Sequence, residues 1–360
     1  MRRSTVVGVV LVGGSLAGAA TFVAAPPTPA VEAALTTTTV AANPQPTTAP
    51  APTATLPPTT TTSTTVPPRR PVIIHGVGDI NFDTAYIPNL AAHGYEYAFE
   101  GLGGLFLEDD LTIINLECTP SLLGTPLSKA FTFRCDPAAL PVARRAGVDV
   151  ANLANNHGQD FGIEAMLDGR ANVNRAGIRA IGTGADVAVA TRPTLVQVGD
   201  WTIAVLGMGG VVPSDGWLAT EDRPGMASGD DLEQMTAAVA AAGEIADYVA
   251  VSIHWMWELE TEPRADDRER AEAMIAAGAD MIFGHHPHRL GDLEFIDGKP
   301  VFWTLGNFIW PRLSDAGATT AVARVVITPD GRIDACLIPA FIETSGRPVL
   351  RGPAPCGEDR

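Results

Sequence analysis

The sequence predicts a mixed α/β domain that follows a long segment without predicted secondary structure. Short apolar runs bounded by Gly, Pro or Asn recur after residue 71, as is typical of buried strands. Alanine-rich or amphipathic segments separate several of these runs, so the order predicts βαβ units. Near the carboxyl end, apolar runs follow one another through turns instead, which favours antiparallel strands.

Residues 1–25 have the composition of a signal peptide or a signal anchor. Arg2 and Arg3 give a positive start, and residues 5–25 carry no charge. Val23-Ala24-Ala25 offers small residues for cleavage, whereas the uncharged run is also long enough to span a bilayer uncut. Because four glycines dilute the hydrophobicity of this run, cleavage is favoured.

Residues 26–70 are predicted to form a disordered Pro/Thr-rich linker. Residues 26–68 contain 15 Thr, 11 Pro and no aromatic residue, so they have too little apolar surface to offset the entropy lost on ordering. Extended at about 3.1 Å per residue, this segment would hold a domain up to roughly 130 Å from its anchor. The order of export signal, spacer and folded domain predicts an extracytoplasmic protein, either secreted or membrane-anchored.

The predicted folded domain, residues 71–360, is strongly acidic. It has 20 Lys and Arg residues against 40 Asp and Glu residues. Nucleic-acid-binding surfaces are basic, so this balance predicts no nucleic-acid partner. It also disfavours electrostatic docking onto an anionic membrane.

The chain has four cysteines and no Cys-x-x-Cys motif. An even number of cysteines in an exported chain favours disulfides. Three pairings are open, and proximity in the sequence favours Cys118–Cys135 and Cys336–Cys356. Buried free thiols are the alternative.

The predicted elements of the domain follow in chain order. Strands are expected at residues 72–77, 111–114, 148–153, 201–206, 248–253, 281–283, 301–305, 320–327 and 333–338, with the last three antiparallel. Helices are expected at residues 137–146, 160–176, 231–246 and 263–277. Asp136 and Asp160 are the expected N-caps of the first two helices, with Pro137 in the first turn of the first.

Polar side chains of metal-binding types follow five of the predicted strands. They are Asp79; Asn115 and Glu117; Asn155, Asn156 and His157; His254; and His285, His286 and His288. Because ligands bind beyond the carboxyl ends of strands in open α/β sheets, these residues are expected to share one rim. Imidazoles combined with carboxylates and carboxamides suit a mixed nitrogen and oxygen site, with room for two metal ions.

Each of these residues also has a simpler interpretation. Asp79 could form a turn, Glu117 could be solvated, and His254 could be a hydrogen-bonded core residue. Three of the seven histidines fall within residues 285–288, however, and the coincidence at five strand ends favours a metal site.

Five other polar residues have less specific surroundings in the sequence. Structural roles are expected for His75 and His93. Asp160 could orient His157 or cap a helix, Glu258 could orient a ligand or face solvent, and Asn307 could contact substrate or form a turn.

The motifs together resemble the CapA family of capsule synthesis, or poly-γ-glutamate biosynthesis, proteins, which are related to calcineurin-like metallophosphoesterases. The motifs are Gly78-Asp79, Asn115-Leu116-Glu117, Asn155-Asn156-His157 with Asp160 and Gly162, His254-Trp255 with Glu258, Gly284-His285-His286-Pro287-His288, and Gly306-Asn307-Phe308. The resemblance implies a four-layer α/β/β/α sandwich. It also implies two divalent metal ions, of Mn, Fe or Zn, at the rim of the sheets.

The resemblance assigns roles to individual residues. The implied metal ligands are Asp79, Glu117, Asn156, His254, His286 and His288. Glu117 is the expected bridging ligand, with Asn115 as its rival. His157 would face the leaving group and Asp160 would orient it.

Three positions depart from the pattern of the wider superfamily or the family. Asn81 stands where metallophosphoesterases usually have His, and Glu117 stands where they usually have Asp. Met256 stands where the family tends to have Gly.

The resemblance favours a metal-dependent, phosphoesterase-like hydrolase that acts on cell-envelope or polymer material during capsule or poly-γ-glutamate synthesis. The alternative is a non-catalytic, membrane-tethered component for assembly or export of an anionic polymer, working with membrane-bound capsule synthesis partners. A third candidate is a metal-dependent peptidase or amidase. No Gly-rich phosphate loop ending in Lys-Ser/Thr is present, so ATP-driven ligation would need other proteins.

Overall fold

A computed structural model describes residues 69–353 and 355–356. The predicted signal segment and residues 26–68 of the predicted linker lie outside the described residues. Within the described part, every helix is too short or too polar to cross a lipid bilayer.

The larger sheet has eight strands and is built around β1 (Val72–Ile80). On one side of β1 lie three parallel strands, β2 (Leu111–Leu116), β3 (Val150–Asn152) and β4 (Arg179–Ile181). On the other side lie three antiparallel strands, β14 (Thr319–Ile327), β15 (Ile333–Thr344) and β16 (Arg347–Leu350). The short β13 (Asn307–Ile309) also pairs with β1.

The second sheet has six strands in the order β11-β12-β10-β9-β7-β6. Its parallel strands are β7 (Trp201–Gly209), β9 (Tyr248–His254), β10 (Met281–His285) and β12 (Lys299–Phe302). Its antiparallel edge strands are β6 (Thr194–Val198) and β11 (Leu293–Ile296). A separate pair is formed by β5 (Thr183–Gly184) and β8 (Gly225–Met226).

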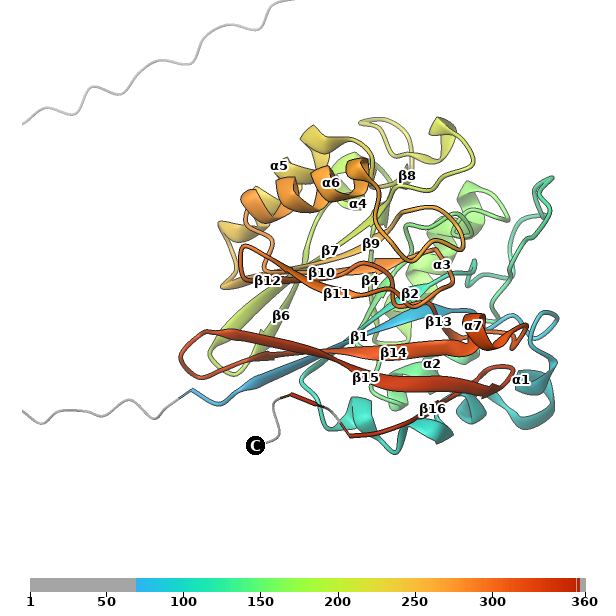
Figure 1. Cartoon of the computed structure of the whole chain (residues 1–360). Coiled ribbons are helices and arrows are strands. Elements are labelled where there is room, and N and C mark those ends of the chain that lie inside the picture. Colours follow the sequence, from blue (N-terminus) through green and yellow to red (C-terminus); the bar gives the residue numbers. More distant parts are fainter. Residues whose placement is uncertain (1–68, 354, 357–360) are drawn as a thin grey trace, which may run out of the picture. The chain divides into compact units, whose positions relative to one another are not determined.

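The two sheets are stacked face to face, and helices cover the outer face of each (Figure 1). Buried apolar side chains from both sheets, such as Ile74 of β1 and Phe283 of β10, form one core between them. The helices α5 (Leu232–Gly243) and α6 (Ala265–Ala276) pack on the six-stranded sheet. The helices that contribute to the core on the outer face of the eight-stranded sheet are α1 (Pro88–His93), α2 (Ala139–Arg145), α3 (Ile163–Arg175), η1 (Tyr95–Ala98), η2 (Glu100–Leu102) and η3 (Leu105–Leu107).

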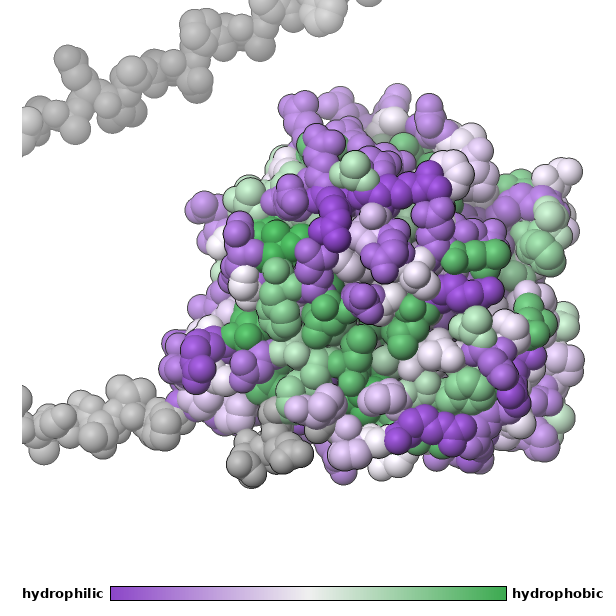
Figure 2. Space-filling model, viewed as in Figure 1, coloured by the Kyte–Doolittle hydropathy of each residue, from purple (hydrophilic) through white to green (hydrophobic). Residues whose placement is uncertain are grey.

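Three short helices complete the described elements: α4 (Val187–Ala190), η4 (Asp215–Trp217) and α7 (Asp315–Ala318). The core between the sheets comes to the surface on one face of the domain, where Figure 2 shows apolar side chains gathered over β11, β14 and β15. Leu293, Ile333 and Leu337 are partly buried against that core.

The expected alternation of strands and helices is confirmed, but each of the four predicted helices starts one to three residues too early. The second helix begins at Ile163 with Gly162 at its N-cap, so Asp160 is not a cap. Its carboxylate accepts hydrogen bonds from the backbone N–H of Phe133 and from Lys129 instead. The first helix begins at Ala139 rather than at Pro137.

The prediction that residues 301–305 begin the antiparallel region is also wrong. The strand here, β12, lies in the six-stranded sheet, parallel to β10. The chain then crosses to the other sheet, where β13 runs parallel to β1 and pairs Asn307 with Asp79. The chain thus passes from β12 of the six-stranded sheet to β1 of the eight-stranded sheet, next to Asp79.

The crossing requires glycine beside Asp79. The backbone N–H of Asp79 donates to the carbonyl of Gly306 over 2.8 Å. A Cβ atom on Gly78 would lie 2.1 Å from that carbonyl oxygen, and Gly306 itself has φ +66°. Both residues therefore permit the close approach that places the strand β13 next to Asp79.

Candidate metal centre

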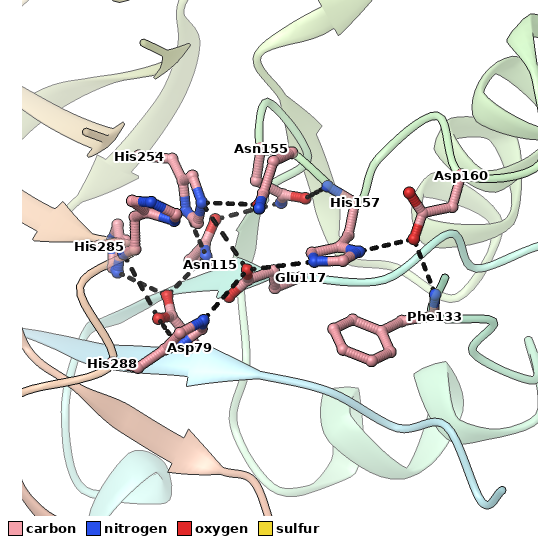
Figure 3. A network of polar contacts seen from close by, with 12 residues as sticks. Asp79, Asn115, Glu117, Phe133, Asn155, His157, Asp160, His254, His285 and His288 are labelled. Carbon is pink, nitrogen blue, oxygen red and sulfur yellow. Dashed lines mark hydrogen bonds and ion pairs between the residues drawn. The ribbon is translucent and has the colours of Figure 1, made fainter. Parts of the chain in front are cut away.

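Side chains from both sheets converge at one edge of the domain (Figure 3). Asp79 comes from β1, Glu117 follows β2, and His254 ends β9. His286 and His288 follow β10 in the same way. Two groups result, Asp79 with Glu117 and His254, and Glu117 with His286 and His288, and in each the potential ligand atoms lie within 4.8 Å of one another.

Glu117 belongs to both groups and is fully buried. Its Oε1 lies 3.7 Å from Nε2 of His254 and 3.8 Å from Nε2 of His288, and neither carboxylate oxygen has a hydrogen-bond partner among the residues that the structure describes. Burial and the nearby charge of Asp79 raise the pKa of Glu117 well above its usual value. Since an unpaired buried carboxylate is costly, bound cations would satisfy this residue.

Asp79 is held in place by several neighbours. Asn115 donates to Oδ1 of Asp79 over 2.8 Å, and Nδ1 of His288 lies 3.0 Å from Oδ2. Burial pushes the pKa of Asp79 upward, but the hydrogen bond and charge of His288 outweigh it, so the pKa lies below its usual value. The amide of Asn115 also lies 3.1 Å from Nδ1 of His254, so Asn115 links two members of one group.

The buried histidines at the cluster are in the form that binds metals. Burial lowers the pKa of His286 to about 4, and burial with the neighbouring His286 lowers that of His254 well below its usual value. These imidazoles are therefore neutral near pH 7, as metal ligands must be. The donor set of imidazole nitrogens and carboxylate oxygens fits a mixed-ligand transition-metal site.

The loops that carry these histidines adopt an unusual backbone. His286 has φ 103° and His288 has φ 55°, a region that costs most non-glycine residues about 1–3 kcal/mol. Met256, where the resemblance implies Gly, has φ 65° and is buried. The backbone of Met256 thus has a conformation that glycine adopts freely, while its side chain packs in the core.

Asn156 also borders the cluster. Its Oδ1 lies 3.0 Å from Nε2 of His254, and the residue is half-buried. The structure thus brings all six residues of the predicted ligand set together, and their binding of metal stays a prediction.

His157 faces the cluster from one side. Its Nδ1 lies 2.6 Å from Oδ2 of Asp160, which leaves Nε2 directed at Glu117, 4.0 Å from Oε1 (Figure 3). Burial lowers the pKa of His157, although Asp160 opposes this shift. The ring of Phe133 packs against the imidazole with centroids 4.1 Å apart. Asp160 therefore orients His157 and does not cap the helix.

The segment 119–134 covers this side of the site. Lys129 donates to Asp160 and to the carbonyl oxygen of Asn156, and Phe133 donates its backbone N–H to Asp160. The predicted disulfide between Cys118 and Cys135 is confirmed and closes the segment directly after Glu117. The second predicted disulfide, Cys336–Cys356, is also confirmed and ties β15 to the carboxyl-terminal residues.

Removing the disulfide beside the cluster is expected to affect both stability and the site. The Cys118→Ala/Cys135→Ala double variant should lose about 3 kcal/mol of unfolding free energy, the value for a loop of this length, as chemical denaturation would measure. It should also bind metal less tightly, because Lys129 no longer holds the backbone of Asn156, a predicted ligand. The Cys336→Ala/Cys356→Ala variant removes the disulfide that closes a loop of similar length, with a sequence separation of 20 residues, away from the cluster, and is the matched control. Equal loss of bound metal in both variants would contradict a local role.

Several contributors to the site have no role assigned by the sequence. Asn155 donates to Leu116 and Asn115 and accepts from the backbone of His157, so it ties two loops together. His285 is buried with Nδ1 3.9 Å from Asp79. Both lie in the motifs noted in the sequence, whereas Lys129 lies in an irregular segment that carries no sequence signal.

The remaining polar candidates lie around the cluster or away from it. His75 pairs with Asp109 within the core, as expected for a structural residue. Glu258 is exposed at a pocket mouth, and Asn307 is buried with its Nδ2 donating to Gly317. Oδ1 of Asn307 has no hydrogen-bond partner within the described residues.

The chain is similar to curated proteins of capsule and polymer synthesis. It is 33% identical over 247 residues to the PGA biosynthesis protein CapA of Bacillus subtilis, covering 67% of this chain and 64% of that protein. It is 34% identical over 212 residues to the "Probable polyglutamine synthesis accessory protein" of Mycobacterium tuberculosis, covering 56% and 55%. The matches thus span less than two thirds of the length of these relatives.

Among solved structures, the NAD nucleotidase of Haemophilus influenzae aligns at 13% identity with a TM-score of 0.47, over 75% of this chain and 50% of that one. The family model described as "Bacterial capsule synthesis protein PGA_cap" matches residues 74–312, which include every predicted metal ligand and His157. This chain therefore belongs to the bacterial capsule synthesis protein family PGA_cap.

Proposed function

We propose that this protein is a metal-dependent phosphoesterase-like hydrolase that serves capsule or poly-γ-glutamate synthesis outside the cytoplasm. Glu117 carries the proposal, because its two unpaired buried oxygens stand between two groups of ligands. The stacked sheets with helices on both sides support the predicted four-layer metallophosphoesterase-like arrangement. The export-type segment at residues 1–25 supports the extracytoplasmic location.

The six predicted ligands would hold two divalent ions, of Mn, Fe or Zn. When bound, such a pair polarises a phosphoryl oxygen and activates water. His157 does the proton chemistry: its Nε2 faces the cluster, and Asp160 fixes the ring through Nδ1. In hydrolysis one water adds to phosphorus and releases a proton to solvent, and the ester P–O bond breaks. The departing alcohol oxygen takes up a proton from Nε2 of His157 in its imidazolium form, and solvent then reprotonates the ring.

Metal removal tests this proposal. Dialysis against a chelator should abolish hydrolysis of generic phosphomonoesters and phosphodiesters, and addition of Mn²⁺, Fe²⁺ or Zn²⁺ should restore it. The melting temperature should fall with the metal, because bound ions offset the cost of burying Glu117 beside Asp79. Full ester turnover in metal-free protein would contradict the proposal.

A non-catalytic role in polymer assembly or export is the second candidate. The 40 acidic against 20 basic residues of residues 71–360 repel an anionic phosphate and an anionic polymer alike, so bound cations would have to attract either ligand. The word "accessory" in the name of the mycobacterial relative points to this role. In this case the centre would hold polymer carboxylates beside membrane-bound synthesis partners, and bound metal without turnover of any ester would be the result.

A further inference from the structure

A pocket of about 460 Å³ opens onto the cluster and changes in character from its floor to its mouth. Asn156, His157, His286 and His288 line it on the side of the metal ligands. Aromatic walls follow, and a set of exposed apolar side chains stands farther out. The ligand side, the aromatic walls and the exposed apolar residues would therefore contact different parts of a substrate.

The aromatic walls support the site histidines. Phe133 is 5% exposed and packs on His157, while Trp310 is 4% exposed and lies with its ring 4.7 Å from that of His288. Tyr86 packs on Phe133 with ring centroids 4.7 Å apart. Because Phe133 and Trp310 are already buried, they offer little free surface to a substrate.

The rim of the pocket combines exposed apolar side chains with the exposed carboxylate of Glu258. The apolar residues are Phe131, Leu259 and Leu313, which are 60%, 57% and 76% exposed. These residues come from three separate segments: the loop closed by the Cys118–Cys135 disulfide, the loop after β9, and the loop between β13 and α7. Single exposed apolar residues are common, but three meeting at one pocket mouth mark a binding surface.

Two basic residues also line the pocket, and both contact the backbone of residues in the ligand cluster. Lys129 is paired with Asp160 and bonded to the carbonyl oxygen of Asn156, whereas Arg289 donates to the carbonyl oxygen of His288 over 2.7 Å. The pocket therefore offers the positive charge of Arg289 beside the ligand cluster and hydrocarbon at the mouth. An amphiphilic molecule with an anionic head matches both.

We propose that the substrate is a phosphoester with an apolar ester group, whose hydrocarbon lies on Phe131, Leu259 and Leu313 while its phosphoryl group is at the cluster. The inference rests on the proposed hydrolase function and names the substrate class for it. A polar alcohol such as glycerol would leave the three rim residues in contact with water. A longer hydrocarbon covers more of them and gains binding free energy in proportion to the area buried.

A homologous series of n-alkyl phosphates from ethyl to octyl tests the proposal with the full-length, metal-loaded protein. The value of kcat/KM should rise about threefold for each methylene that reaches the rim, and glycerol phosphate should be among the slowest substrates. The Phe131→Ser/Leu313→Ser variant should flatten this dependence. Leu195→Ser/Phe295→Ser replaces two exposed apolar residues on other strands, β6 and β11, and is the matched control.

Equal turnover of glycerol and octyl phosphates, or a chain-length dependence that the rim variant leaves intact, would overturn the inference. Turnover that is absent for every ester would instead contradict the proposed function. Calorimetric titration with n-alkylphosphonates, whose P–C bond is not hydrolysed, then tests whether the pocket binds alkyl chains without any turnover. Affinity should rise with chain length in the wild-type protein and not in the rim variant, and chain-length-independent binding would reject the apolar site.

Discussion

The Glu117→Gln variant is expected to lose its bound metal and all measurable ester hydrolysis. Glutamine keeps the size of the side chain but removes the charge from the one residue shared by both ligand groups. Metal affinity should fall by more than about 100-fold, since even outer-shell changes cost about 10- to 100-fold. Metal content after gel filtration, measured by mass spectrometry, checks the result.

Stability separates this effect from misfolding. Without metal, Glu117 is buried beside Asp79, so its replacement by a neutral side chain should leave the metal-free protein at least as stable as the metal-free wild type. Glu258→Gln alters an exposed carboxylate at the mouth of the same pocket and should keep its metal. A Glu117→Gln protein that holds the wild-type amount of metal would rule out the bridging role.

The His157→Ala variant should keep its metal but lose about 10²- to 10⁴-fold in kcat/KM, the usual contribution of a positioned acid or base. The imidazole stands 4.0 Å from Glu117 through Nε2 and is oriented by Asp160, so its removal takes away the proton donor without removing a ligand. Assays with alkyl and aryl phosphates check the role. Aryl esters should lose less activity, because a phenolate leaves without a proton more easily than an alkoxide.

His93→Ala is the control for this variant. His93 is exposed and stacks on Tyr97, away from the cluster, so its replacement should not change turnover. An equal loss for alkyl and aryl esters in His157→Ala, or a loss of metal with the imidazole, would show that His157 acts in some other way than as the proton donor.

The polar strand ends could be predicted because buried parallel strands leave a clear sequence pattern. Asp79, His254 and His285 each end or nearly end a fully buried and mostly apolar strand, and their types fit one chemistry. The disulfide between Cys118 and Cys135 followed from proximity in the sequence. Local patterns of this kind determine where a strand ends and which residue follows it.

The rest depends on contacts between distant segments. The strand β12 looks like its antiparallel successors but pairs with β10, and only the crossing through Gly306 brings Asn307 to Asp79. Asp160 has the sequence position of a helix cap. In the structure its carboxylate instead contacts Lys129, some 30 residues earlier, and His157. No pattern within either segment records these pairings.

Anomalous X-ray diffraction from crystals of the purified protein tests the metal centre most directly. Data collected across the absorption edges of Mn, Fe and Zn should show two peaks flanking the carboxylate of Glu117, one beside Asp79 and His254 and the other beside His286 and His288. Ordered density for these side chains with no anomalous peak among them, in protein grown and purified with these metals, would contradict the proposed centre.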